Sequence, residues 1–347
     1  MSDRSPLTYE RFASAGGHHM PAPAAGGRSR EPRFRRSDVY TQPVVDGQEL
    51  RDGVWTRLLA WLRAATTSTA ERREAELHAT LRSSPRPTRT NTIAVVSPKG
   101  GVGKTTCTFL LGNVLASHLR LRVLAVDANR DFGTLASLAP DEARVERSLA
   151  DLLADMKEVH SAPELSPYVS PLPTGLHVLA APERAEVMAE MTPTTYGELL
   201  AFLSRYYDVI LLDLGTGIID PLAQFGIQRA DQALVVTTPE YVTADKVLGA
   251  LRYLNAEGGW DGGHNGDGSD SERLTVVLNR APAARSGDRQ VIEAAFRRLG
   301  IARHIVIPYD DRLRVMLDSA TYTLEGLERT TRMPIKQLGL AAARKLV

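Results

Sequence analysis

Residues able to bind phosphate are concentrated in one short stretch, 98–106, which reads P-K-G-G-V-G-K-T-T. Glycines lack a Cβ atom, so backbone N–H groups can close around an oxyanion there. Lys104 can reach the β and γ phosphates of a nucleotide, and the Thr105 hydroxyl can ligate Mg²⁺. The stretch therefore predicts a phosphate-binding loop. Its predicted nucleotide contacts are Gly100, Gly101, Val102, Gly103, Lys104, Thr105 and Thr106.

The segments on either side of this loop have the patterns of a strand and a helix. Residues 93–96 form a short apolar run rich in β-branched side chains, and the residues after the loop place apolar side chains on one helical face. Those helical positions are Leu110, Leu111, Val114, Leu115 and Leu119. A helix that begins at the loop directs the positive end of its dipole toward a bound phosphate.

Two aspartates stand where a nucleotide site of this kind needs carboxylates. Asp127 ends the apolar run 123–126, and Asp213 ends the apolar run 209–212. Ligands of open α/β sheets bind at the carboxyl ends of the strands. One such aspartate alone commonly caps a helix. Two of them beside a phosphate loop predict a Mg²⁺ site made by Thr105, Asp127 and Asp213.

From Asn91 onward, apolar strands alternate with helical patterns. This alternation predicts an α/β fold, a doubly wound and mostly parallel sheet with helices on both faces. Strands are expected at 92–97, 122–127, 176–180, 208–213, 232–237, 273–279 and 303–307. Helices are expected at 105–119, 147–157, 194–206, 219–229, 241–256 and 288–299, and 334–347 is expected to pack on the domain or to target a membrane.

The first 90 residues have a different composition. Residues 1–45 are rich in Arg, Pro and Gly, which predicts a disordered tail, either solvated or in contact with DNA, anionic lipid or an acidic partner. Residues 46–84 predict a helical extension of two helices, 48–64 and 70–81, and residues 85–90 a linker before the 91–347 domain. The first helix carries Trp55 and Trp61 on its apolar side, so it packs on protein or lies on a membrane surface.

Composition limits the classes of partner and the compartment. Forty-two Lys and Arg against 41 Asp and Glu give a net charge of +1, so no global basic field favours nucleic acid. The single cysteine, Cys107, cannot form an internal disulfide, which favours a reducing, cytoplasmic location. No apolar run approaches the roughly 18 residues of a membrane-spanning helix, so we expect at most peripheral attachment. The glycine-rich segment 258–270 predicts a loop.

The phosphate loop departs from the common G-x-x-x-x-G-K-S/T pattern in an informative way. Pro98 occupies the first glycine position, and an extra lysine, Lys99, follows it. This loop resembles the deviant Walker A loop K-G-G-x-G-K-S/T of the MinD/ParA family. The resemblance implies a Mg-ATP-dependent ATPase that forms a homodimer on binding ATP. It also implies that Lys99 reaches across the dimer to the nucleotide of the other copy.

The resemblance assigns further roles near the phosphates. Asp213 is similar to a Walker B aspartate that holds Mg²⁺ through water. Asp127 opens the family's D-x-D segment, whose second aspartate positions the attacking water, but this chain has Asn129 there and Asp131 two residues later. An amide can orient water but cannot take its proton, so the resemblance implies ATP hydrolysis that is slow.

Segments near the C-terminus resemble the family's adenine pocket. Asn279 ends one strand and is expected to pair with the adenine edge. The turn after the next strand, with Pro308 and Asp310, is expected to cover the adenine face. The N-K-x-D element of guanine-specific sites is not found in the sequence.

The helices before the loop, taken with residues 127–135, look like actinobacterial MinD-like ATPases associated with type VII secretion, the EspI type. This resemblance implies a dimerising ATPase switch that controls a protein partner, such as a secretion apparatus. The alternatives are a ParA-like partition protein that coats DNA and a MinD-like organiser at the membrane. A fourth possibility, prompted by Asn129, is a nucleotide-binding scaffold without useful turnover. The expected location is the cytoplasm, with peripheral association at the membrane or the nucleoid as the alternative.

Overall fold

The computed structural model describes residues 69–129, 133–184, 187, 191–215, 220–256, 273–282, 287–298 and 304–346. The predicted tail 1–45, the tryptophan helix 48–64 and the glycine-rich loop 258–270 lie outside these residues, as does Asp131.

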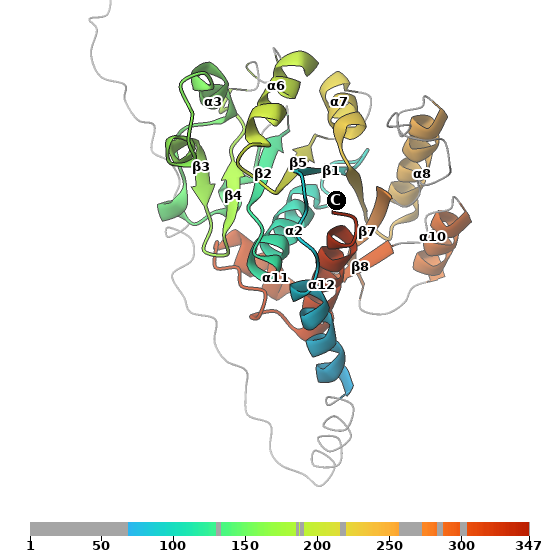
Figure 1. Cartoon of the computed structure of the whole chain (residues 1–347). Helices are drawn as coiled ribbons and strands as arrows, with labels where there is room; N and C mark the ends of the chain where they lie inside the picture. Colours follow the sequence, from blue (N-terminus) through green and yellow to red (C-terminus); the bar gives the residue numbers. More distant parts are fainter. Residues whose placement is uncertain are drawn as a thin grey trace, which may run out of the picture.

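A mostly parallel sheet forms the centre of the described part of the chain (Figure 1). Its strand order is β3-β4-β2-β5-β1-β6-β7-β8, and only the β3–β4 pair is antiparallel. The strands are β1 (Asn91–Val96), β2 (Val123–Ala128), β3 (Val169–Pro171), β4 (Leu176–Leu179), β5 (Val209–Leu214), β6 (Gln232–Thr237), β7 (Leu274–Ala281) and β8 (His304–Pro308). The predicted doubly wound α/β fold is confirmed, and β3 was not predicted because three residues carry no readable period.

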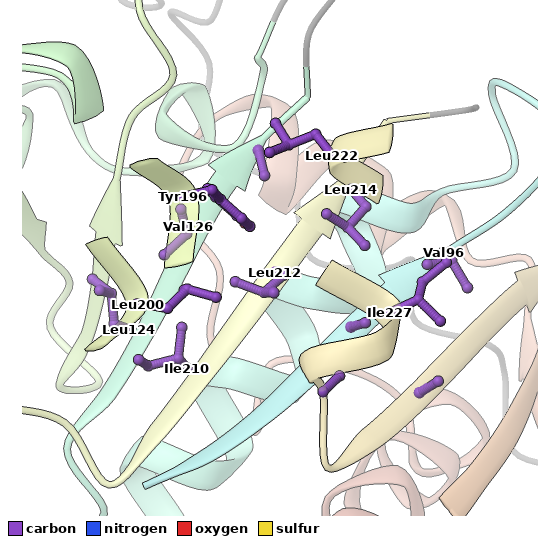
Figure 2. Close-up of a cluster of buried hydrophobic side chains, with 14 of the residues drawn as sticks. Val96, Leu124, Val126, Tyr196, Leu200, Ile210, Leu212, Leu214, Leu222 and Ile227 are labelled. Carbon is purple, nitrogen blue, oxygen red and sulfur yellow. The ribbon is translucent and has the colours of Figure 1, made fainter. Parts of the chain in front are cut away.

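Helices cover both faces of the sheet. They are α2 (Lys104–Leu119), α3 (Leu149–Asp155), α4 (Ala162–Leu165), α6 (Pro193–Leu203), α7 (Pro221–Arg229), α8 (Tyr241–Ala256), α10 (Gly287–Arg298), α11 (Asp311–Asp318) and α12 (Arg329–Ala343), preceded by a helix over residues 69–82. Alternate side chains of β1 enter opposite cores: Ala94 and Val96 face α6, α7, α8 and α10, and Ile93 and Val95 face α2, α11 and α12. Figure 2 shows the first core, with side chains of β2 and β5 directed toward α6 and α7.

The last helix differs from its prediction at its start. We expected it to begin at Pro334, but α12 begins at Arg329 and contains that proline. The helix packs on the domain as expected: Ile335 and Leu338 are buried. Gly339 approaches α2 so closely that a Cβ atom there would lie 2.3 Å from Val114 Cγ1.

The helix over residues 69–82 lies against α12. Leu81 is fully buried in the same core as Ile335. Glu74 accepts hydrogen bonds from the side chains of Arg332 (2.7 Å), Lys336 (2.9 Å) and Arg329 (3.0 Å). A single carboxylate therefore joins this helix to three cations of α12. In the part of the chain that is described, no helix combines the length and apolar character needed to cross a membrane.

Candidate nucleotide site

The predicted phosphate loop lies between β1 and α2. Gly101 has φ +76° and Gly103, the N-cap of α2, has φ +93°, a backbone region that favours glycine. A Cβ atom at Gly103 would lie 2.2 Å from Asn279 Nδ2. Because α2 begins at Lys104 and has no acidic residue in its first turn, the N–H groups of that turn can receive an anion.

Thr105 and Asp213 come together beside the loop. Thr105 lies close enough to the Asp213 carboxyl to lower its pKa, and the Thr108 hydroxyl lies 3.4 Å from Asp213 Oδ1. Lys104 is the first residue of α2, is mostly buried and exerts its charge on the same carboxylate. The structure thus gathers three of the predicted site residues at the start of α2.

Asp127 and Asp213 are partners in register on the neighbouring strands β2 and β5. They are 1% and 2% exposed, so water screens their charges poorly. Burial raises the pKa of Asp127 to about 6, and burial together with the Asp127 charge raises the pKa of Asp213 to about 7. A divalent cation would remove this penalty, because it favours both ionised carboxylates.

The donor set suits Mg²⁺. Two carboxylates and the Thr105 hydroxyl are hard oxygen ligands, and Mg²⁺ completes its octahedron with water and substrate phosphate. Within the described ranges no group of three or more His, Cys, Asp or Glu side chains could hold a metal by itself. The arrangement therefore fits a Mg²⁺ ion that arrives with a nucleotide better than a resident protein-only metal site.

Asp127 also anchors the turn that follows β2. Its carboxylate accepts hydrogen bonds from the backbone N–H of Leu135 (2.9 Å) and of Asn129 (3.3 Å). Gly133 lies so close that a Cβ atom there would come within 2.4 Å of Asp127 Oδ2. Asn129 is therefore held at the carboxyl end of β2, where its predicted role with water stays a prediction.

Asn279 and Arg280, at the end of β7, support the phosphate loop from behind. Asn279 is 3% exposed, and its Nδ2 donates to the carbonyl of Val102 at 2.8 Å. Arg280 Nη1 donates to the carbonyl of Gly101 at 3.0 Å. The structure gives the Asn279 amide a partner within the protein, and pairing with adenine stays a prediction. Sequence reasoning missed Arg280, whose adjacency to Asn279 was the only available signal.

The turn after β8 is tied to the end of β7. Pro308 ends β8, and the backbone N–H of Tyr309 donates to the carbonyl of Ala281 at 2.8 Å. Asp310 is the N-cap of α11 and accepts from the N–H of Leu313 at 3.1 Å. The structure therefore shows Asp310 as a helix cap, and the predicted contact of this turn with adenine stays a prediction.

Lys99 points toward the start of α8. Its Nζ donates to Thr243 Oγ1 at 2.7 Å and lies 3.4 Å from Glu240 Oε2. A cavity of about 430 Å³ adjoins it, lined by residues 99–102 of the loop, residues 238–240, Arg280 and Pro282. No local sequence pattern indicated Thr243, which lies 144 positions from Lys99.

The chain is similar in sequence and in fold to several known proteins. Residues 90–255 match a family model described as an AAA domain. The chain is 28% identical over 290 residues to the ESX-1 secretion-associated protein EspI of Mycobacterium tuberculosis, a match that covers 82% of this chain and 41% of EspI. It therefore spans less than half the length of that relative.

Two further comparisons concern MinD proteins. MinD of Bacillus subtilis is 27% identical over 64% of this chain and 77% of its own length. The structure of MinD from Pyrococcus horikoshii, complexed with Mg-ADP, has a TM-score of 0.55 at 24% identity and covers 73% of this chain and 94% of its own. Its likeness concerns the fold. Together with the loop and the strand-end aspartates, these relatives show that the chain belongs to the MinD/ParA family of P-loop ATPases.

Proposed function

We propose that this protein is an ATP-dependent switch that dimerises. Two copies bind Mg-ATP face to face, each Lys99 neutralises charge on the nucleotide of the other copy, and hydrolysis separates the copies and releases a partner protein. The position of Lys99 carries the proposal. Its ammonium contacts α8 rather than its own loop, and its side chain is 37% exposed. Because exposed ion pairs contribute little, Lys99 can exchange Glu240 for a phosphate.

Within one copy, the remaining residues bind and orient the nucleotide. Lys104 and the N–H groups of residues 100–106 hold the phosphates, and Thr105 with Asp213 and Asp127 holds Mg²⁺. The ion neutralises the charge that develops on the transferred phosphoryl group. Asn129 orients the attacking water but leaves its proton to the solvent or the phosphate, which makes hydrolysis slow.

The partner we favour is a component of a type VII secretion system. The likeness to EspI extends over 82% of this chain and supports this choice. No described feature favours DNA or membrane as strongly, and the net charge of +1 does not favour DNA. We therefore include DNA and lipid as alternative partners in the experiments below.

The test is sedimentation velocity on the full chain without nucleotide, with Mg-ADP and with Mg-ATP. We expect a dimer with Mg-ATP only, and Lys99→Ala should stay monomeric while it still binds ATP. Lys157→Ala removes an exposed lysine outside the site and should dimerise like the wild type. A wild-type protein that stays monomeric with saturating Mg-ATP contradicts the switch.

Two further arms separate the alternatives. Phosphate release and sedimentation are measured with DNA and with liposomes of anionic lipid. Salt-sensitive, ATP-dependent DNA binding would favour the partition protein. Recruitment to liposomes that is lost in Trp55→Ala/Trp61→Ala would favour the membrane organiser. If no phosphate is released under any condition, the result would favour a nucleotide-binding scaffold that does not hydrolyse ATP.

A further inference from the structure

A second cavity lies near the C-terminal end of α2, away from the phosphate loop at the start of this helix. It has a volume of about 400 Å³, and its lining includes His78, Arg82, His118, Arg120, Tyr322 and Glu325. The helix over residues 69–82, the end of α2 and the segment between α11 and α12 all contribute. Since His118 lies 14 residues along α2 from Lys104, the cavity is about 20 Å from the nucleotide site. We call it the seam cavity, because it joins residues 69–82 to the domain.

Positive charge dominates the seam cavity. His78, Arg82, His118 and Arg120 face a single carboxylate, that of Glu325, which lies 4.0 Å from His118 Nε2. In the described part of the chain, Arg82 and Arg120 make no ion pair and no side-chain hydrogen bond. Both arginines are exposed, and among the described residues no carboxylate pairs with their guanidinium groups.

The pKa of His118 is affected by the same excess of positive charge. Burial lowers its pKa, and the charges of Lys336, His78 and Arg82 lower it further, whereas Glu325 alone raises it. These groups belong to every element packed around the ring: α12, the helix over residues 69–82 and the segment before α12. An added anion would reverse this effect and favour protonated His118.

Tyr322 forms part of the wall of the cavity. Tyr322 Oη is enclosed and has no hydrogen-bond partner in the described structure. The Tyr322 ring is fixed by an edge-on contact with Phe109, at 5.3 Å between centroids. Because this hydroxyl is enclosed, Tyr322 offers the cavity its ring and not a hydrogen-bond donor.

The rest of the lining is mixed, with the polar residues Asn113, Ser117, Thr174 and Thr323 beside apolar ones. Val114, Leu324 and the Tyr322 ring contribute apolar surface. A cavity of about 400 Å³ lies in the range of small-molecule sites, which have mainly apolar walls and a few converging polar groups. A bare inorganic ion would leave most of this volume unfilled.

We propose that the seam cavity binds a small organic anion, a phosphate or carboxylate group on an apolar body. Arg82, Arg120 and the two histidines bind the oxyanion, and the apolar body lies on the Tyr322 ring and Leu324. Because Arg82 and His78 belong to residues 69–82 and the other groups to the domain, the ligand clamps this helix onto the domain. This site is independent of the proposed switch.

The test uses phenyl phosphate and the full chain saturated with Mg-ADP, so that the phosphate loop is occupied. Histidine ring signals are followed by NMR and assigned with His78→Gln and His118→Gln. We expect a saturable shift of both signals, with His118 moving toward its protonated form. Benzoate tests the carboxylate form of the ligand, and a shift of the same two signals supports an oxyanion site. Phenol tests the need for charge, and an equal shift with phenol overturns the proposal.

Matched variants locate the binding. Arg82→Gln/Arg120→Asn should weaken phenyl phosphate binding at least about tenfold, because charge-assisted hydrogen bonds are lost. Arg72→Gln/Arg73→Gln removes the same charge from exposed positions of the helix and should not change the affinity. No saturable shift, or a shift that survives in the first double variant, overturns the proposal.

The clamp has a readout of its own. Phenyl phosphate should slow amide hydrogen exchange in residues 69–82 of the wild type and not in Arg82→Gln/Arg120→Asn. Unchanged exchange in the wild type, alongside shifted histidine signals, would overturn the clamp and retain the binding site.

Discussion

Tyr196 and Tyr207 are both buried tyrosines near the sheet, but only one hydroxyl has a partner. Tyr207 Oη lies 2.9 Å from His177 Nδ1, whereas Tyr196 Oη has no hydrogen-bond partner in the described structure. We predict that Tyr196→Phe raises the free energy of unfolding of the nucleotide-free protein by about 1 kcal/mol and that Tyr207→Phe lowers it by a similar amount. Urea denaturation measures both. Changes of the same sign would contradict the assignment.

Asp213 should make the nucleotide-free protein less stable as the pH rises. Its folded pKa, about 7, lies above the ordinary aspartate value of 3.8, so the native state holds a proton that the unfolded state releases between these values. The contribution of Asp213 is present at acidic pH and is lost as the pH rises toward 7. Asp213→Asn removes this dependence, so in EDTA it should be more stable than the wild type at pH 8 and similar to it near pH 4.

Urea denaturation across this pH range provides the measurement. Glu142→Gln changes an exposed carboxylate and should follow the wild type at every pH. An Asp213→Asn variant with the same pH dependence as the wild type would show that Asp213 is ionised in the folded protein. Saturating Mg-ATP should reduce the difference at pH 8, because the cation stabilises the ionised carboxylate.

At the residue scale, the sequence predicted which side chains come together at the nucleotide site, but not the long-range hydrogen bonds that position them. Asp127, Asp213 and Thr105 were expected together because parallel strands end at one edge and the loop opens there. The contacts of Lys99 with Thr243 and of Arg280 with Gly101 join residues 144 and 179 positions apart. No local pattern reports such pairs, since they depend on the pairing of β6 with β1 and of β7 with β6.

At the scale of elements, Glu74 joins the helix over residues 69–82 to α12. Hydrogen bonds from Arg332 first, and then from Lys336 and Arg329, lower the pKa of Glu74 to about 2. Lys336 has a side chain only 6% exposed, so loss of Glu74 leaves a buried ammonium without its carboxylate. We predict that Glu74→Gln lowers the free energy of unfolding by about 3 kcal/mol.

Chemical denaturation at pH 7 tests this prediction, with Glu71→Gln as the control. Glu71 is 62% exposed and lies 3.9 Å from Arg329, so its loss should cost less than about 0.5 kcal/mol. The stabilisation from Glu74 is present above the ordinary glutamate pKa of 4.5 and is lost as the pH falls toward 2. Equal effects of the two variants at pH 7 would contradict the role of Glu74.

The elements themselves were predicted where a period was readable. The seven longer strands and the charged helix near residues 70–81 follow from hydrophobic pattern. The start of α12 was misplaced, because Pro334 normally marks a helix boundary whereas here the helix continues through it. Contacts of Arg329, Arg332 and Lys336 with Glu74 stabilise that stretch, and they join residues more than 250 positions apart.

At the scale of the whole molecule, the sequence predicted a linker at 85–90 and a domain that begins at 91. The contacts of residues 69–82 lead to a different expectation for stability. A chain that begins at residue 85 loses both Leu81, which is fully buried, and Glu74. We predict that it is at least about 3 kcal/mol less stable than a chain that begins at residue 69. Equal stabilities by urea denaturation would support an independent domain.

One edge of the sheet also restricts how copies of this protein can meet. β3 is three residues long, runs antiparallel to β4 and ends in Pro171, which has no N–H to offer a further strand. The backbone N–H of Val145 donates to Ser170 Oγ at 3.1 Å, so the segment before α3 contacts this strand. Such an edge resists the strand addition that leads to aggregation. The proposed ATP-dependent dimer can therefore form and dissociate without competition from irreversible strand pairing at β3.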